Sequence, residues 1–196
     1  MAHTLSDFKG ALLGGGARPN LFRVEIPNIG LTDTEHLLIK GAQLPESTVG
    51  LVEVPFRGRT FKVAGDRTFA PWSVTVINDE NMNIRKAIEG WMQEIAQYED
   101  GSGATLPGDY MKEATVVQLL RNSSDTAAKN GNGLNDGKSY TFHDIFPTSL
   151  SAIDLSYDSS DVLEEFTVEF QVNYWVPNDL GSKKTQPTLS TEVQIA

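Results

Sequence analysis

Alternation of apolar and polar residues along this chain predicts a protein built mainly of β-strands. In LFRVEIP, which begins at Leu21, the apolar residues Phe22, Val24 and Ile26 alternate with more polar neighbours. A period of two is typical of a strand with one buried face. The most regular alternation lies in residues 163–176. Further strands are predicted at residues 35–44, 49–58, 59–65, 72–78, 112–120, 139–145 and 150–157.

One segment, residues 81–99, has the period of a helix instead. Ile84, Ile88, Trp91 and Ile95 recur at i, i+4, i+7 and i+11, and charged residues stay off that stripe. Such a stripe packs against a sheet. Asp79 is the expected N-cap, because its carboxylate can accept a hydrogen bond from the first turn.

The segments 49–58 and 59–65 predict a long hairpin that turns near Arg57-Gly58-Arg59, with Pro55 favouring an edge or irregular strand. The expected fold is therefore mainly antiparallel β, a sandwich or open barrel with one packed helix and this hairpin. Residues 1–17 are expected to form a glycine-rich arm, residues 18–176 one domain, and residues 177–196 a polar extension. The polar stretch 122–138 is expected to be a loop that is either functional or mobile.

The charge and composition of the chain argue against several classes of function. The formal charge of −10 argues against binding through nucleic-acid phosphates, which relies on Lys and Arg. The chain has no cysteine, which excludes disulfides and thiolate chemistry and is consistent with a reducing cytoplasm. We see neither a secretory h-region nor an apolar run long enough for a transmembrane helix, so we expect no membrane anchoring.

We find no pattern of catalysis, cofactor binding or metal binding. His3, His36 and His143 are scattered, and Gly14-Gly15-Gly16 lacks the context of a phosphate loop. The stretch NGNGLNDG at 130–137 faintly resembles a calcium loop, but Leu134 occupies a ligand position and the final Glu is absent. The chain is therefore not expected to be an enzyme, to hold a cofactor or to bind a metal.

Several ordered blocks together resemble the tail tube proteins of contractile-tailed bacteriophages. The resemblance covers roughly residues 17–176. It is carried by ARPNLF at 17–22, the Leu44-Pro45 step, VAGDRTF at 63–69, WSVTVINDE at 72–80, the helix near Trp91 and FTVEFQVNYW at 166–175.

The resemblance implies a structural virion protein, a β-sandwich subunit whose hexameric rings stack into a tube inside a contractile sheath. Its implied partners are other copies of itself, the sheath protein, the tape-measure protein, the baseplate hub or tube initiator, the tail terminator, and double-stranded DNA in passage. It implies a place in the virion tail, assembled in the host cytoplasm. A ring of about two dozen strands would be wider than the ~16–18 strands that already leave a channel.

A wide channel needs a polar wall, and two predicted strands offer one. The hypothesis is that the following polar side chains face the lumen: Thr167, Glu169, Gln171, Asn173, Ser73 and Thr75. Neutral or acidic groups there would give passing DNA no anchor. The alternative is that this face is outer solvent surface, because an antiparallel sheet commonly has one wet side.

The step Gly65-Asp66-Arg67 is interpreted as a turn or subunit contact, with Gly65 allowing a backbone conformation that a Cβ would resist. Asp66 and Arg67 are expected to make charge-assisted hydrogen bonds there, and Arg57 and Arg59 to take part in subunit contacts. Following the resemblance, the hairpin and both termini are assigned to ring stacking. Three rivals remain open: a tube protein of a type VI secretion or extracellular injection system, a baseplate tube initiator, and an unrelated β-sandwich binding module or hydrolase.

Overall fold

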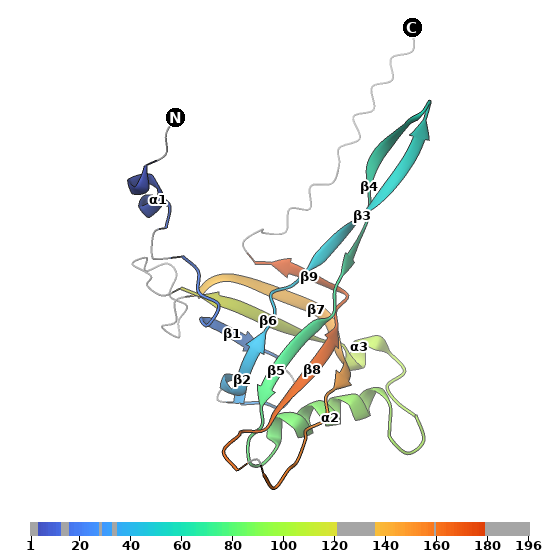
Figure 1. Cartoon of the computed structure of the whole chain (residues 1–196). Helices are drawn as coiled ribbons and strands as arrows, with labels where there is room; N and C mark the ends of the chain where they lie inside the picture. The colour runs from blue at the N-terminus through green and yellow to red at the C-terminus, as the bar shows by residue number, and fades with distance from the viewer. Residues whose placement is uncertain are drawn as a thin grey trace.

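The computed structural model describes residues 4–12, 16–27, 29–32, 35–120, 136–158 and 160–178. Strands predominate, as predicted (Figure 1). In chain order the elements are α1 (Leu5–Ala11), β1 (Phe22–Glu25), the 3-10 helix η2 (Glu35–Leu38), β2 (Ile39–Ala42), β3 (Ser47–Phe56), β4 (Arg59–Phe69), β5 (Trp72–Ile77), α2 (Asn83–Ile95), α3 (Pro107–Tyr110), β6 (Lys112–Leu119), β7 (Asp136–Leu150), β8 (Glu165–Gln171) and β9 (Tyr174–Pro177).

The main sheet is antiparallel, with strand order β1-β6-β7-β8-β5-β2 and β9 on the free side of β7. The long strand β7 divides this sheet into two layers. Its first part pairs with β6 and β9, and its last part pairs with β8. Between them, Asp144 has a left-handed φ of 54°, next to a register shift opposite β6. This bulge redirects β7, and the result is the predicted open sandwich, in which β1 and β2 remain edges.

Aromatic side chains join the two layers in the core. Trp72 stacks on Phe142 at 4.5 Å between ring centroids and also contacts Phe170 at 5.4 Å. Trp91 of α2 reaches Phe170 at 5.8 Å. The predicted helical stripe is confirmed, because Ile84, Ile88 and Trp91 are buried and Ile95 packs partly buried against the core.

The start of α2 differs from the prediction. The N-cap is Met82, in the left-handed region at φ 54°, and not Asp79. Asp79 still satisfies the helix end, because its Oδ1 accepts the backbone N–H of Asn83 at 2.8 Å. The Asp79 carboxylate therefore satisfies one free N–H group of the first helical turn, although Asp79 lies three residues before the N-cap.

Four strand predictions were wrong in extent. Residues 35–38 form η2, so only the second half of the predicted strand 35–44 is extended. The segments 139–145 and 150–157 are replaced by the continuous β7, and residues 151–157 belong to a loop. The strand predicted at 163–176 is two strands, because the chain leaves β5 and β7 after Gln171 and then pairs with the first part of β7 as β9.

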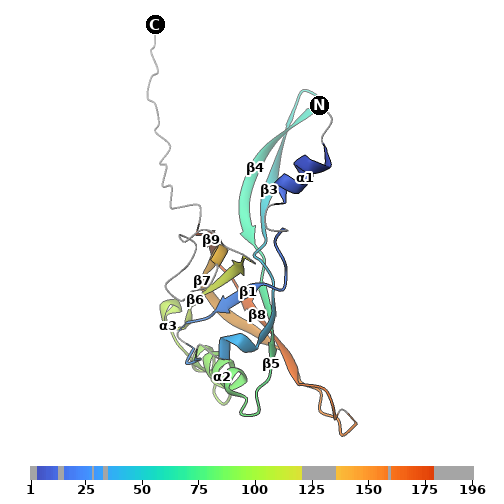
Figure 2. The ribbon, with the colours of Figure 1, turned by 90° about the vertical axis from the view of Figure 1, so that its left-hand side faces the viewer.

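The predicted hairpin is confirmed as a separate two-stranded sheet of β3 and β4 that extends away from the sandwich (Figures 1 and 2). Arg57 at φ 45° and Gly58 at φ 78° form its turn. Two consecutive left-handed residues match the right-handed twist of a hairpin, and glycine takes that conformation without cost. Strand β4 runs on to Phe69, beyond the predicted end at Gly65.

The two ends of the chain add detail to the expected arm and extension. Within the predicted arm, α1 begins with a capping box in which Thr4 and Asp7 bond to each other's backbone. At the other end, the backbone N–H of Asn178 donates to the Ser139 carbonyl at 3.0 Å, so the sheet continues slightly past residue 176. Most of the predicted loop 122–138 and of the extension 177–196 lies outside the described residues; the described part of that loop, 136–138, is strand.

Candidate assembly surfaces of the hairpin and the sheet

One face of the β3–β4 hairpin is apolar and uncovered. Cross-strand partners share a face, and the pairs Phe56 with Arg59, Val54 with Phe61, and Val52 with Val63 alternate with the other face. We call the following residues the apolar hairpin face: Val52, Val54, Phe56, Phe61 and Val63. All are exposed, and both phenylalanines retain 66% of their accessible surface. A soluble monomer rarely leaves such a contiguous apolar surface in water.

The opposite hairpin face is mixed in character. It carries Leu51, Pro55 and Thr60 together with an ion pair in which Lys62 Nζ lies 3.7 Å from Glu53. An isolated two-stranded hairpin is marginally stable at best in water. The hairpin therefore has one face suited to solvent and one suited to burial against a partner.

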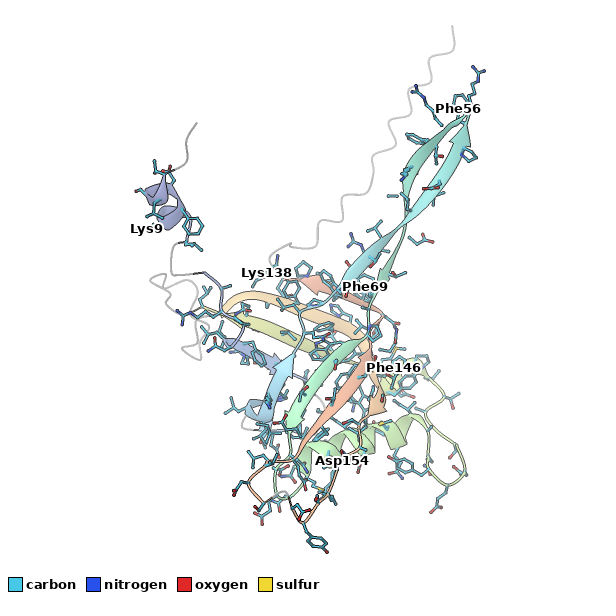
Figure 3. The ribbon with its side chains drawn as sticks, viewed as in Figure 1. Lys9, Phe56, Phe69, Lys138, Phe146 and Asp154 are labelled. Atoms are coloured by element: carbon cyan, nitrogen blue, oxygen red, sulfur yellow. The ribbon has the colours of Figure 1, made fainter. Side chains whose placement is uncertain are left out.

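The root of the hairpin is fixed to the sandwich by aromatic contacts. Phe69 packs edge-on against Trp175 at 6.0 Å between ring centroids, and the Trp175 indole N–H donates to the Glu46 carbonyl at 3.2 Å. Phe69 lies at the root and Phe56 at the far end (Figure 3). The hairpin thus has an anchored base and a free tip.

Gly65-Asp66-Arg67 lies inside β4 and not at a turn. The register passes from Val49 opposite Arg67 to Leu51 opposite Ala64, so Gly65 and Asp66 together oppose Gly50. Two residues opposite one define a β-bulge. A glycine is needed at residue 65 because the two strands approach each other closely there, and not because the backbone is left-handed. A Cβ added to Gly65 would lie 3.2 Å from the Gly50 carbonyl carbon.

The charged residues predicted near this hairpin are spread along it. Asp66 and Arg67 are exposed at the bulge, while Arg57 and Arg59 are exposed at the tip. The Arg57 guanidinium lies over the Phe56 ring at 5.4 Å. None of the four forms an ion pair with another residue among those described. Their charges are free to meet a second molecule.

The predicted polar row is brought together on the face of β5 and β8 that points away from the core. Ser73 pairs with Glu169 and Thr75 pairs with Thr167, whose hydroxyl oxygens are 3.5 Å apart. The intervening residues Val74 and Val168 are buried. Strict alternation therefore produces one apolar and one polar face.

The two remaining residues of that row behave differently. Gln171 ends β8 opposite Phe146 and stays on the polar face. Asn173 lies in the break between β8 and β9, where its side-chain amide approaches the Met111 sulfur at 3.8 Å. Tyr174 is 42% exposed and stacks on His143. The change of strand partners after Gln171 breaks the alternation.

Charges on the polar face are few. Lys40 of β2 reaches across β5 to Glu165 of β8, with 2.5 Å between Nζ and Oε1. Glu169 is exposed, and its carboxylate has no ion-pair partner within the described ranges. The face is thus neutral to weakly acidic.

Ionisable groups with clearly shifted pKa values lie away from both surfaces. Hydrogen bonds from Thr4, Thr32 and Ser102 lower the pKa of the carboxyls of Asp7, Glu35 and Asp100, respectively. These groups stabilise local turns. Over the described residues, no three His, Cys, Asp or Glu side chains gather as a metal would need, and no helix is long and apolar enough to cross a membrane.

The family resemblance assigned the hairpin to ring stacking but did not single out the residues of its apolar face. The signal was present, because VEVPF and FKV alternate with the same period as the core strands. Nothing in that period tells whether an apolar face meets the core of its own chain or another molecule.

Comparisons with known proteins identify the family of this chain. The family model described as "Phage tail tube protein" matches residues 17–178. The tail tube protein gp19 of Enterobacteria phage T4 is 33% identical over 162 residues, which cover 83% of this chain and 92% of that protein. The tail tube protein of Serratia phage KSP90 is 26% identical over 176 residues, covering 86% and 93%.

Solved structures share the fold at low sequence identity. The anti-feeding prophage tube-terminating cap has a TM-score of 0.58 at 15% identity, covering 83% of this chain and 90% of that one. The sheath–tube complex of an extracellular contractile injection system has a TM-score of 0.55 at 12% identity, covering 90% and 98%. With the family match over most of its length, this chain belongs to the phage tail tube protein family.

Proposed function

We propose that this chain is the subunit of the inner tube of a contractile phage tail and that it forms hexameric rings that stack into that tube. The observation that carries the proposal is the apolar hairpin face, which is exposed in the single chain. Full burial of one Val or Phe side chain stabilises by about 1.5–3 kcal/mol. Five such residues on an anchored hairpin supply a strong drive to associate with neighbouring copies.

The edges of the sandwich support closure into a ring. Strands β1 and β2 end the main sheet and have unpaired backbone groups on their outer sides. An exposed edge is a template for pairing with another chain. When one edge of a subunit joins a different edge of the next, the contact is heterologous, and it gives a closed ring if the rotation closes.

The polar face of β5 and β8 is assigned to the lumen. Ser73, Thr75, Thr167 and Glu169 would present hydroxyls and a carboxylate to the channel, and Gln171 would extend this row. Lys40 of β2 lies on the same face, but its charge is paired with Glu165. The strands β2, β5 and β8 therefore offer no unpaired cation to DNA phosphates, so double-stranded DNA passes with little binding. Asn173 falls outside the row and is left out of this assignment.

The tube has further partners in this proposal. The sheath surrounds it, the tape-measure protein occupies it during assembly, and a baseplate hub or initiator and a terminator bound its ends. Its place is the virion tail, after assembly in the bacterial cytoplasm. The role is structural, without catalysis. A tube for protein delivery by a secretion or injection system is less favoured, because the relatives at 26–33% identity are phage tail tube proteins, whereas the injection-system likeness lies in the fold alone.

A paired substitution on the hairpin tests the proposal. Val54→Ser with Phe61→Ser removes apolar surface from the exposed face and leaves the sandwich core intact. Tube formation, followed by negative-stain electron microscopy, is expected to fall at least tenfold, while the urea unfolding of the single subunit stays unchanged. Leu51→Ser on the opposite hairpin face is the matched control and should still assemble. Equal assembly of all three proteins would overturn the role of this face.

A further inference from the structure

A second apolar surface lies at the end of the molecule opposite the hairpin. The described parts of the connection from β7 to β8, residues 151–158 and 160–164, project there in both views (Figures 1 and 2). In Figure 3 the labelled Asp154 lies toward this end of the molecule and Phe56 at the other. Four large apolar side chains are exposed on this loop: Leu155, Tyr157, Val162 and Leu163. Tyr157 has no shielding at all, with a relative exposure of 108%.

These side chains border a groove of about 460 Å³ between the two arms of the loop. The groove is lined by Asp154, Leu155, Ser156, Tyr157, Val162, Leu163 and Glu164. Its lining combines exposed apolar side chains with the carboxylates of Asp154 and Glu164. The Glu164 carboxylate accepts a hydrogen bond from the Asn78 amide at 2.9 Å, which ties one rim of the groove to the sandwich.

The charge of this loop is of one sign. Residues 151–164 contain Asp154, Asp158, Asp161 and Glu164 and no Lys or Arg. The hairpin tip has the opposite character: the stretch FRGRTFK at 56–62 holds Arg57, Arg59 and Lys62 among its aromatic residues and no carboxylate. One end of the molecule thus presents cations around aromatic rings, and the other presents carboxylates around an apolar groove.

We propose that the groove of the 151–164 loop accepts the β3–β4 hairpin tip of a second copy of this chain, in the next ring. The inference rests on the proposed function and names the acceptor of the hairpin. Phe56 and its neighbours enter the apolar groove, and the Arg57 and Arg59 guanidiniums pair with the rim carboxylates. Arg and carboxylate form charge-assisted, often bidentate hydrogen bonds, and aromatic anchors in a pocket carry much of an interface's energy.

The positions of tip and groove make this contact self-propagating. A contact between opposite ends leaves a free tip and a free groove on every pair, so it adds copies along one axis without closing. Helix α1 is a weaker candidate for the groove: Leu5, Phe8 and Leu12 are exposed, but α1 carries one acidic and one basic residue and so offers no net charge to match the acidic rim.

A charge exchange tests the proposal. Arg57→Glu with Arg59→Glu reverses the tip, and Asp154→Arg with Asp161→Arg reverses the loop; none of these four side chains has an ion pair among the described residues. Each paired variant alone is expected to form rings but to lose tubes at least tenfold in electron micrographs. A 1:1 mixture of the two, or one chain carrying all four changes, is expected to restore tubes. Glu80→Arg with Glu99→Arg is the control of equal charge change.

The outcomes separate this inference from the proposed function. If the wild-type chain forms tubes and the loop variant forms them equally well, the groove is not the acceptor, although the tube function stands. Failure of the combined variant to recover also overturns the pairing. If the wild-type chain forms neither rings nor tubes, the proposed function is wrong as well.

Because the chain has no cysteine, a disulfide gives a second readout on a clean background. Phe56→Cys with Val162→Cys is expected to yield a ladder of covalent multimers when assembled tubes are oxidised, since neighbouring Cα atoms within about 4.4–6.8 Å can be bridged. Either single variant gives at most dimers. A ladder from Phe56→Cys with Leu12→Cys, and none from the first pair, would place the tip against α1 and contradict the proposal.

Discussion

Gly50 on β3 and Gly65 on β4 meet backbone to backbone at the hairpin bulge, where a Cβ on Gly65 would lie 3.2 Å from both the Gly50 carbonyl carbon and a Val52 methyl group. A branched side chain at residue 65 must push the two strands apart. We expect Gly65→Val to change the direction of the hairpin tip and to reduce tube formation at least tenfold. The unfolding temperature of the single subunit should stay within about 2 °C, because the bulge lies outside the core; a 1 kcal/mol change would shift it by about 2–4 °C.

Ala64→Val is the matched control for that prediction. Residue 64 is an exposed position of the same strand, adjacent to the bulge and paired with Leu51. It should accept a β-branched side chain, which suits a strand. Normal tubes from Gly65→Val would show that the bulge does not set the hairpin's direction.

Gly90 lies exposed in the middle of α2, and a Cβ there would meet no atom within 4 Å. Glycine inside a helix costs about 0.8–1.0 kcal/mol relative to alanine. Gly90→Ala is therefore expected to raise the free energy of unfolding by up to about 1 kcal/mol, measured by urea denaturation. The same change at Gly103 should destabilise, because its Cβ would lie 1.9 Å from the Ile95 carbonyl oxygen. If both substitutions raise the free energy of unfolding, or both lower it, this prediction is wrong.

If Glu169 faces the channel, a lysine in its place should make the tube retain DNA. In Glu169→Lys tubes, a short DNA duplex is expected to be retained and protected from nuclease at low salt, and released as salt rises, since phosphate binding weakens with salt. Wild-type tubes should protect none. Glu99→Lys, beyond α2 and away from this face, is the control. If Glu99→Lys tubes protect DNA equally, or Glu169→Lys tubes do not, the polar face does not line the channel.

Acid should weaken the turn that precedes η2. The Glu35 carboxylate accepts the Thr32 backbone N–H at 2.6 Å and its hydroxyl at 2.8 Å, which lowers the pKa of Glu35 below 4.5. A lowered folded-state pKa gives stability that is present above the ordinary value and is lost as pH falls through the lowered one. The difference in unfolding free energy between the wild type and Glu35→Gln should therefore shrink as the pH drops below about 4. A difference independent of pH, or a Glu35 carboxyl that titrates above 4.5 by NMR, would refute it.

Local patterns predicted those elements whose structure is decided locally. The stripe of Ile84, Ile88 and Trp91 marked α2, and the Arg57-Gly58 step marked the hairpin turn. The polar row of β5 and β8 followed from strict alternation.

Elements decided by distant partners were predicted less well. Alternation predicts two separate strands at 139–145 and 150–157, but pairing with β6 and then β8 keeps β7 continuous through Asp144 and Pro147, which lie near register shifts. Asn173 and Tyr174 left the expected alternation because the chain changes partners there. Period alone also failed to show that the face of Val54 and Phe61 remains uncovered, since that depends on which elements pack nearby.

The most direct test of the account is negative-stain electron microscopy of the purified full-length chain over a concentration series, with and without a preformed tube nucleus. A tube subunit should give hollow rings and stacked tubes with six-fold end views, lengthening as concentration rises. Compact single subunits at every concentration, even with the nucleus present, would contradict it.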